Sequence, residues 1–282
     1  MMPELRCRTY TRGRDLRPVP RDPGQALNCW RATSGEKDDG LPGWCPLPDT
    51  SFFAISERGG REVNEDAILA RHAGDHLLLG IADGLGGHAR GEVASGIAIG
   101  ALGRIDADAL SSSDPELLLL QVFTEANIQI VLYNREHGVN SGTTLTACIV
   151  SPAGRCTIGN LGDSRAYVID EQICWHTKDH SYLQQLIDAG ELTEDAAVRH
   201  PRANIITRAL GLERGCVPDI SDLQAGGKVL VLTSDGIHDY IDPARFRELA
   251  LIPGNREAAF ALIDEAVFHG STDNLSVILC RP

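Results

Sequence analysis

An α+β fold of layered sheets and helices is the class that this chain predicts. Strand-like segments occur both in close series and between helices, without the regular strand–helix alternation of a doubly wound sheet. Two apolar runs, LLLGIADG at 77–84 and VLVLTSDG at 229–236, stop abruptly at Asp-Gly, as expected of buried strands that end at a solvated rim. The chain has 282 residues, 43% of them hydrophobic, which suits one large domain or two small ones.

Residues 1–50 differ in composition from the rest of the chain. Six arginines and four prolines fall within the first 24 residues, with no helical or strand period. We therefore expect 1–50 to be a poorly ordered, basic and Pro-rich extension, with a basic docking tail as the alternative. Residues 51–282 are expected to form the folded domain.

The first half of this domain begins with strands and continues with two helices. The expected strands are 51–56, 67–71 and 77–82, and the expected helices are 91–104 and 115–136. Asp114 followed by Pro115 has the pattern of a helix N-cap and first turn. Four further strands are expected in close series, at 143–150, 155–159, 165–170 and 172–176. Their spacing, with Gly-containing or Asp-containing turns, predicts an antiparallel meander.

The second half of the domain alternates again between helices and strands. We expect a short helix at 182–189, an irregular segment at 190–204, a core strand at 228–233, a helix at 255–268 and a closing strand at 275–280. No internal repeat is visible.

Charge and cysteine content exclude several classes of protein. The formal net charge is −13 and the sequence pI is about 5.1, so a nucleic-acid partner is not expected. No apolar stretch reaches about 18 residues and no apolar signal core is present, so we expect a cytoplasmic protein without a membrane partner. None of the eight cysteines forms CxxC or has zinc-like spacing with histidine.

Acidic residues at strand ends are the main chemical signal. Asp83 and Asp235 end apolar strands, Asp273 precedes one, and Glu65-Asp66 form a further pair. Each alone is explained by turn chemistry or a solvated charge. Together they predict a cation site, because two such charges about 4 Å apart repel by roughly 4 kcal/mol at an effective dielectric near 20. Oxygen ligands favour Mg²⁺, Mn²⁺ or Ca²⁺ over zinc.

Residues 51–282 resemble a known family over their whole length. The motifs occur in the family's order: RxxNED at 61–66, ADGLGGHARGEVAS at 82–95, SGTTLTA at 141–147, GNLGDSRAYVI at 159–169, TKDHSYLQQLIDAGEL at 177–192, HPRANIITRALG at 200–211, TSDGIHDYI at 233–241 and STDNLSVI at 271–278. This set is similar to the bacterial metal-dependent protein phosphatases of the protein phosphatase 2C, or PPM, type. The resemblance implies a central β-sandwich of two antiparallel sheets with helices on both outer faces, in four αββα layers.

The resemblance also implies a site with two core metal ions, Mn²⁺ or Mg²⁺. Asp83 would bridge both ions. The Gly84 carbonyl, accessible because glycine has no Cβ, would complete the coordination of one ion together with Glu65. Asp235 and Asp273 would bind the other ion.

Three further residues take roles by the same resemblance. Asp66 would orient a metal-activated water, which attacks phosphorus in line, and Arg61 would hold the substrate phosphate as a bidentate fork. His88, in the Asp-Gly loop, is a candidate general acid, with a metal-bound water as the alternative proton donor. His180 and His200 are expected to be structural or surface residues.

The family's third, weaker metal is in doubt for this sequence. Asp235 and Asp239 match two of its positions, but the position three residues before the glycine of SGTT is Val139, which cannot bind a metal. The segment from Asp179 to about Arg202 corresponds to the family's flap, where we expect substrate choice to be set.

The expected function is a metal-dependent protein serine/threonine phosphatase. Its partners would be phosphoserine and phosphothreonine proteins and a cognate Ser/Thr kinase that it opposes in signalling, with control of type VI secretion as one setting. A monomer is expected. Two alternatives are a non-catalytic phosphoprotein-binding or scaffold domain and a hydrolase of another phosphoester, such as a nucleotide.

Overall fold

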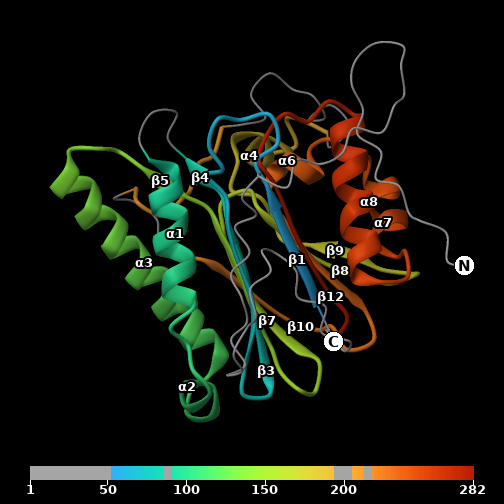
Figure 1. Cartoon of the computed structure of the whole chain (residues 1–282), viewed down its shortest axis with the longest axis horizontal. Coiled ribbons are helices and arrows are strands. Elements are labelled where there is room, and N and C mark those ends of the chain that lie inside the picture. Colours follow the sequence, from blue (N-terminus) through green and yellow to red (C-terminus); the bar gives the residue numbers. More distant parts are fainter. Residues whose placement is uncertain (1–51, 86–89, 194–204, 213–216) are drawn as a thin grey trace, which may run out of the picture.

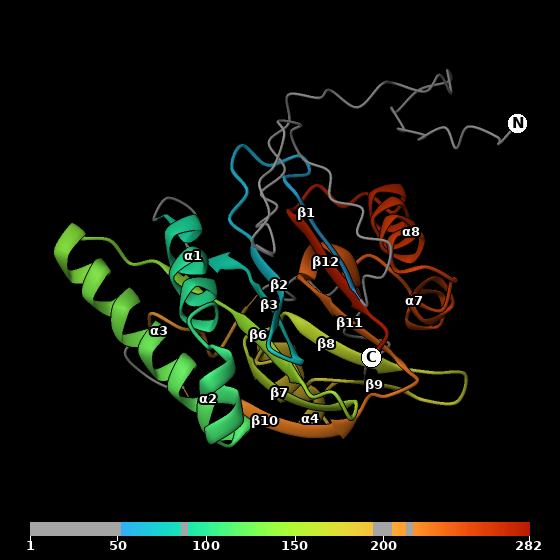
Figure 2. The same cartoon turned by 60° about the horizontal axis from the view of Figure 1, so that its bottom comes forward.

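Two five-stranded antiparallel sheets face each other, and helices cover the outer face of each (Figures 1 and 2). The computed structural model describes residues 52–85, 90–193, 205–212 and 217–282, so the predicted 1–50 extension lies outside the described residues. The layering confirms the predicted αββα architecture.

The first sheet contains both the first and the last strand of the described chain. Its order is β1 (Phe52–Glu57), β12 (Leu275–Cys280), β11 (Val229–Thr233), β8 (Arg165–Ile169) and β9 (Cys174–His176). All neighbours pair antiparallel, with Thr233 opposite Val277 and also opposite Arg165. The end of β11 therefore lies beside the starts of β8 and β12.

The second sheet is built from the middle of the chain. Its order is β10 (Asp219–Gln224), β7 (Arg155–Leu161), β6 (Leu145–Val150), β3 (His76–Ala82) and β2 (Ala67–Ala73). A short ribbon of β4 (Gly84–Leu85) and β5 (Gly142–Thr143) continues from β3. Every residue of β3 after His76 is buried, as expected of a central strand.

The helices pack on the two outer faces. Helices α1 (Gly91–Leu102), α2 (Ala107–Ser112) and α3 (Pro115–His137) cover the second sheet, whereas α7 (Pro243–Ala250) and α8 (Asn255–Phe268) cover the first. The predicted cap of α3 is confirmed, because the Asp114 side chain accepts a hydrogen bond from the Glu116 N–H. Gly138, at φ 65°, ends the helix.

Three apolar clusters make up the core. One lies between α1–α3 and the second sheet, one lies between α7–α8 and the first sheet, and one fills the space between the sheets. The inter-sheet cluster contains Cys148, Cys156 and Cys280, which are fully buried free thiols. Burial raises the pKa of Cys148 and Cys280, so these cysteines serve as small apolar residues.

The predicted meander is wrong at one connection. Strands β6 and β7 pair in one sheet and β8 and β9 pair in the other, because the turn at 162–164 carries the chain between the sheets. Strand spacing alone cannot reveal such a change of sheet. The longest elements that were not predicted are the half-exposed edge strand β10 and α7, which begins at the Asp242 cap; the short β4, α2 and a four-residue helix at 235–238 were not predicted either. No helix of the described residues is long and apolar enough to span a bilayer.

Candidate metal centre

Carboxylates from both sheets meet at one edge of the sandwich. Asp83 follows β3 of the second sheet, Asp235 follows β11 of the first, and Asp273 precedes β12. The Asp83 carboxyl interacts electrostatically with those of Asp66 and Asp235, and both raise its pKa. Asp235 also interacts electrostatically with Asp273. The structure therefore brings together four of the acidic residues predicted from the sequence.

The backbone of Asp83 is fixed by the SGTT segment. The Asp83 N–H donates to Thr144 Oγ1 at 2.9 Å, and its carbonyl accepts from the Thr144 N–H at 2.9 Å and from Thr143 Oγ1 at 2.8 Å. Burial and the nearby carboxylates raise the pKa of Asp83 well above its ordinary value. The two threonines thus hold in place a carboxylate that is unfavourable there without a cation.

Asp66 lies buried behind Asp83. Its Oδ2 accepts hydrogen bonds from Ser234 Oγ at 2.8 Å and Ser276 Oγ at 2.6 Å, whereas its Oδ1 is buried without a partner. Burial is the largest cause that raises the Asp66 pKa to about 6. Ser234 directly follows β11 and Ser276 lies near the start of β12. Asp66, which precedes β2 of the second sheet, is therefore hydrogen-bonded to the first sheet.

Glu65 is placed by its backbone and by two glycines. Its carbonyl accepts from the Gly84 N–H at 3.1 Å and from Ser95 Oγ at 2.6 Å. A Cβ on Gly84 would lie 2.4 Å from the carbonyl carbon of Gly91, so only glycine allows this approach. Burial, followed by the charge of Glu92, raises the Glu65 pKa. Glu65 and Gly84 are therefore neighbours, as the prediction for one metal ion requires.

Arg61 lies at the solvent-facing rim of the carboxylate group. Its side chain is 56% exposed, and its Nη2 donates to Asp273 Oδ2 at 2.6 Å. The hydrogen bond to Asp273 is the largest cause that raises the Arg61 pKa. Among the described residues, Arg61 is the only positively charged side chain that is hydrogen-bonded to one of these carboxylates.

Asp163 was not among the predicted site residues, although the structure places it in the same electrostatic cluster. It lies in the turn between β7 and β8, is 7% exposed, and its Oδ1 has no hydrogen-bond partner. Burial, then Asp235, raises its pKa well above the ordinary value, and Asp239 contributes as well. The missed signal was the Asp of GNLGDSRAYVI, which was interpreted only as a turn.

Val139, the position that lacks a carboxylate, lies just beyond the end of α3, where its N–H donates to the Asn134 carbonyl.

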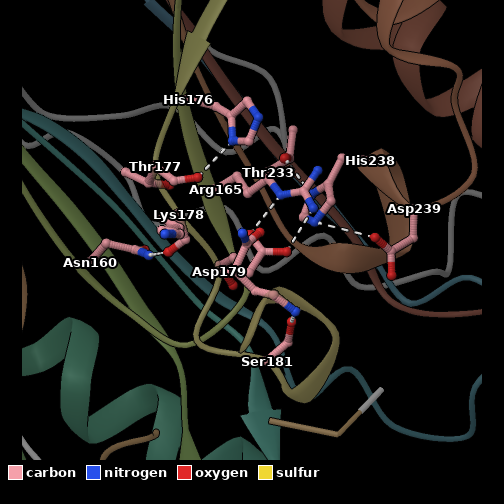
Figure 3. Close-up of polar contacts among 12 residues, drawn as sticks. Asn160, Arg165, His176, Thr177, Lys178, Asp179, Ser181, Thr233, His238 and Asp239 are labelled. Atoms are coloured by element: carbon pink, nitrogen blue, oxygen red, sulfur yellow. Dashed lines mark hydrogen bonds and ion pairs between the residues drawn. The ribbon is translucent and has the colours of Figure 1, made fainter. Parts of the chain in front are cut away.

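A polar cluster supports the neighbouring α6 (Asp235–His238) and its next residue, Asp239 (Figure 3). His238 is buried, its Nδ1 lies 2.9 Å from Thr233 Oγ1, and its Nε2 lies 3.6 Å from Asp239 Oδ1. Burial lowers the His238 pKa well below its ordinary value. Burial and Asp235 raise the Asp239 pKa to about 7. The neutral His238 imidazole therefore lies beside the acidic cluster but adds no positive charge to it.

The residues present fit divalent cations by their donor chemistry. In the part of the chain that the structure describes, no three Asp, Glu, His or Cys side chains are already arranged as ligands of one ion. Instead, the buried carboxyl groups repel one another, and two buried carboxylate oxygens have no partner. Hard cations with oxygen ligands would satisfy these oxygens and remove the repulsion.

Stability without metal is expected to depend on pH. The pKa values of Asp66 and Asp235 are raised from 3.8 to about 6, so the folded chain binds these protons more tightly than the unfolded chain. Their contribution to stability is complete below the unfolded value of 3.8 and is lost as the pH rises through about 6. In EDTA, the thermal midpoint should therefore fall as the pH rises from about 4 to about 7.

Adding Mn²⁺ should remove most of this fall, because a cation then replaces the protons. Differential scanning fluorimetry across this pH range, with EDTA or Mn²⁺, measures both effects. A midpoint in EDTA that rises with pH would contradict the expectation.

The histidines predicted from the motifs divide into two groups. His88, the candidate general acid, and His200 lie outside the described residues. His180 is buried, 7% exposed, in agreement with the structural role expected for it.

The sequence is similar to proteins of one family. Residues 56–253 match the protein phosphatase 2C family. The chain is 35% identical over 242 residues to the serine/threonine protein phosphatase PstP of Mycobacterium tuberculosis, covering 81% of this chain but only 44% of PstP. It is 35% identical over 214 residues to the serine/threonine phosphatase stp of Listeria innocua, covering 71% of this chain and 82% of that protein.

Solved structures show the same similarity. The catalytic domain of PstP in complex with two manganese ions superposes with a TM-score of 0.72 at 33% identity, over 82% of this chain and 96% of that one. PppA, described as a key regulatory component of the type VI secretion system in Pseudomonas aeruginosa, superposes with a TM-score of 0.69 at 28% identity, over 82% and 98%.

Proposed function

The chain belongs to the protein phosphatase 2C family of Mn²⁺- or Mg²⁺-dependent protein phosphatases, and from this membership we propose that it removes phosphate from phosphoserine and phosphothreonine in proteins. The observation that carries the proposal is the meeting of Asp83, Asp235 and Asp66 beside the exposed Arg61–Asp273 pair. Lost carboxylates would instead favour a non-catalytic binding domain, but all five predicted core acidic residues are present.

Two divalent cations, once bound, would supply an activated water and positive charge for the phosphoryl oxygens. We assign Asp83, Glu65, Asp235, Asp273 and the Gly84 carbonyl as the groups that would hold them. Asp163 and Asp239, which interact with Asp235, are the groups available to a further cation. Asp163 offers a carboxylate that interacts with Asp235 and Asp239, so the presence of valine at 139 does not by itself remove that capacity.

The chain's own residues perform the remaining tasks. Arg61 can turn from Asp273 to the substrate, because its side chain is half exposed and its planar guanidinium matches two phosphoryl oxygens. Asp66 keeps Oδ1 directed away from its two serine donors, so this oxygen is free to orient a water by hydrogen bonding.

The test is a substrate panel with the purified protein. Hydrolysis of a phosphothreonine peptide should require Mn²⁺ or Mg²⁺ and should cease in EDTA. A phosphotyrosine peptide and a nucleoside triphosphate, offered under the same conditions, should react much more slowly. Preferred hydrolysis of the nucleotide would overturn the proposal in favour of another phosphoesterase, and Mn²⁺ binding without any hydrolysis would indicate a binding domain.

For the physiological substrates, we propose a class of proteins and no single member of it. Phosphoproteins made by a cognate Ser/Thr kinase are the class that the proposed site would take. The structural similarity to PppA supports the components of a type VI secretion system as one setting for such substrates. Identification of an adjacent kinase gene, followed by dephosphorylation of that kinase's products, tests this assignment.

A further inference from the structure

His180 lies beside two described stretches of chain, 181–193 and 205–207. Backbone hydrogen bonds join these stretches to each other and to His180. The Tyr182 N–H donates to the Ile205 carbonyl at 2.8 Å, and the Thr207 N–H donates to the His180 carbonyl at 2.7 Å. The two stretches therefore form a stem with His180 at its base.

The base of this stem is bonded to the turn that carries Asp163. The His180 N–H donates to the Gly162 carbonyl at 2.9 Å, and the Gly162 N–H donates to His180 Nδ1 at 3.1 Å. Two hydrogen bonds thus join one histidine to one glycine, out of contact with solvent because His180 is 7% exposed. The residue after this glycine is Asp163, so the two bonds restrict where its carboxylate lies.

The same glycine also touches the residue that holds Asp83. A Cβ on Gly162 would lie 2.5 Å from Thr144 Cγ2, and its φ of 111° is one that other residues rarely adopt. Thr144 in turn bonds to both the N–H and the carbonyl of Asp83. The imidazole is therefore connected to two acidic residues of the cluster, to Asp163 by the chain and to Asp83 through Thr144.

The hydrogen bond from Gly162 sets the role of Nδ1. A backbone N–H can only donate, so Nδ1 accepts from Gly162. On the other side of the ring, Nε2 lies 3.2 Å from Asp219 Oδ2 and 2.7 Å from Arg208 Nη1. Arg208 Nη1 lies 2.9 Å from Asp219 Oδ1 and holds this carboxylate, and Arg208 also donates to the Val217 carbonyl.

A charged ring would lose this arrangement, because both of its nitrogens would be donors and Nδ1 would face another donor. Burial is the largest cause that lowers the His180 pKa, which keeps the ring neutral near pH 7. The neutral ring therefore keeps Nδ1 available as the acceptor for the Gly162 N–H.

We propose that His180 is a positioning residue of the metal centre: through Nδ1 it fixes the Gly162-Asp163 turn, while Asp219 and Arg208 contact the ring at Nε2 and hold it in place. The inference rests on the proposed metal-dependent function only in that Asp163 and Asp83 are taken to meet cations. A histidine that merely fills space in the stem would stabilise the fold without affecting metal binding.

The test compares three replacements of His180. Asparagine offers an amide oxygen at the position of Nδ1 and can accept from Gly162. Glutamine places its amide farther out, near the position of Nε2, and leucine has no acceptor. Mn²⁺ affinity is measured by isothermal titration calorimetry, and the Gly162 amide signal is followed by ¹⁵N NMR. Thermal midpoints report general loss of stability.

The leucine and glutamine variants should bind Mn²⁺ about 10-fold or more weakly than wild type, in the range seen for groups that orient ligands. The asparagine variant should stay within about 3-fold of wild type, on the same reasoning, and keep the wild-type Gly162 amide shift. Equal affinities of the asparagine and glutamine variants would overturn the proposal, even if the leucine variant failed to fold.

The outcome is separable from that of the phosphatase assay. Wild-type protein that binds Mn²⁺ without hydrolysing phosphopeptides would sink the proposed function but leave the comparison of His180 variants intact. Active protein whose variants differ only in thermal midpoint would sink the positioning role alone. Wild-type protein that binds no Mn²⁺ would contradict both.

Discussion

Replacing Asp83 with asparagine is expected to lower Mn²⁺-dependent phosphatase turnover by about 10²-fold or more, beyond the 10- to 100-fold typical of groups that only orient metal ligands. Asparagine keeps the shape of the side chain and leaves the backbone bonds to Thr144 in place. It removes, however, the charge that would be shared by two cations. Steady-state kinetics on a phosphothreonine peptide at saturating Mn²⁺ measures the loss.

The same variant should be more stable than wild type in EDTA. The buried Asp83 carboxyl, with its pKa raised well above the ordinary value, destabilises the metal-free fold at neutral pH, and a neutral amide avoids that cost. Addition of Mn²⁺ should then raise the thermal midpoint of the variant less than that of wild type. This opposite change in activity and stability distinguishes a ligand from a residue needed for folding.

Asp75→Asn is the matched control for this experiment. Asp75 is exposed in the turn between β2 and β3, at the opposite end of β3 from Asp83. It should leave both turnover and the Mn²⁺ effect unchanged. An Asp83→Asn protein that keeps more than a tenth of wild-type turnover would contradict the bridging role.

Replacing Arg165 with methionine is expected to destabilise the protein by about 3–5 kcal/mol, because it leaves a buried partner charge uncompensated. Arg165 binds Asp179 through two hydrogen bonds, Nε to Oδ1 at 2.7 Å and Nη2 to Oδ2 at 2.6 Å (Figure 3). The two side chains are 23% and 11% exposed. Chemical denaturation followed by circular dichroism measures the change in the free energy of unfolding.

Arg155→Met tests whether burial is the cause. Arg155 also pairs with an aspartate, Asp222, but the two side chains are 69% and 39% exposed, and such pairs contribute less than about 1 kcal/mol. The double variant Arg165→Met with Asp179→Leu should recover much of the lost stability, because it removes both charges together. A cost for Arg165→Met as small as that for Arg155→Met would contradict this account.

The parts of the fold that the sequence predicted are those with local signals. Asp114-Pro115 marks the start of α3, and the apolar runs before Asp83 and Asp235 mark β3 and β11. The change of sheet at 162–164 has no such signal, because it depends on which strands pair at a distance. The edge strand β10 alternates too weakly in hydrophobicity to be recognised.

The candidate site was predictable to a similar extent. Asp83, Asp235, Asp273 and Glu65-Asp66 stand in recognisable motifs, and the structure gathers them as expected. The support for these residues could not be predicted, since Ser234 and Ser276 lie 168 and 210 residues from Asp66 in the chain. Asp163 was missed for a related reason: a turn aspartate has an ordinary local explanation, and only its burial with an unpartnered oxygen shows otherwise.

The pairing of β1 with β12 has a consequence for biosynthesis. In the sheet order β1 has β12 as its only neighbour among the described strands, and Arg61 meets Asp273 across 212 residues of sequence. A ribosome that has not yet released β12 therefore carries a chain whose β1 is unpaired and whose Arg61, Glu65 and Asp66 lack their later partners. We therefore expect a nascent chain to lack the proposed activity until β12 is inserted between β1 and β11.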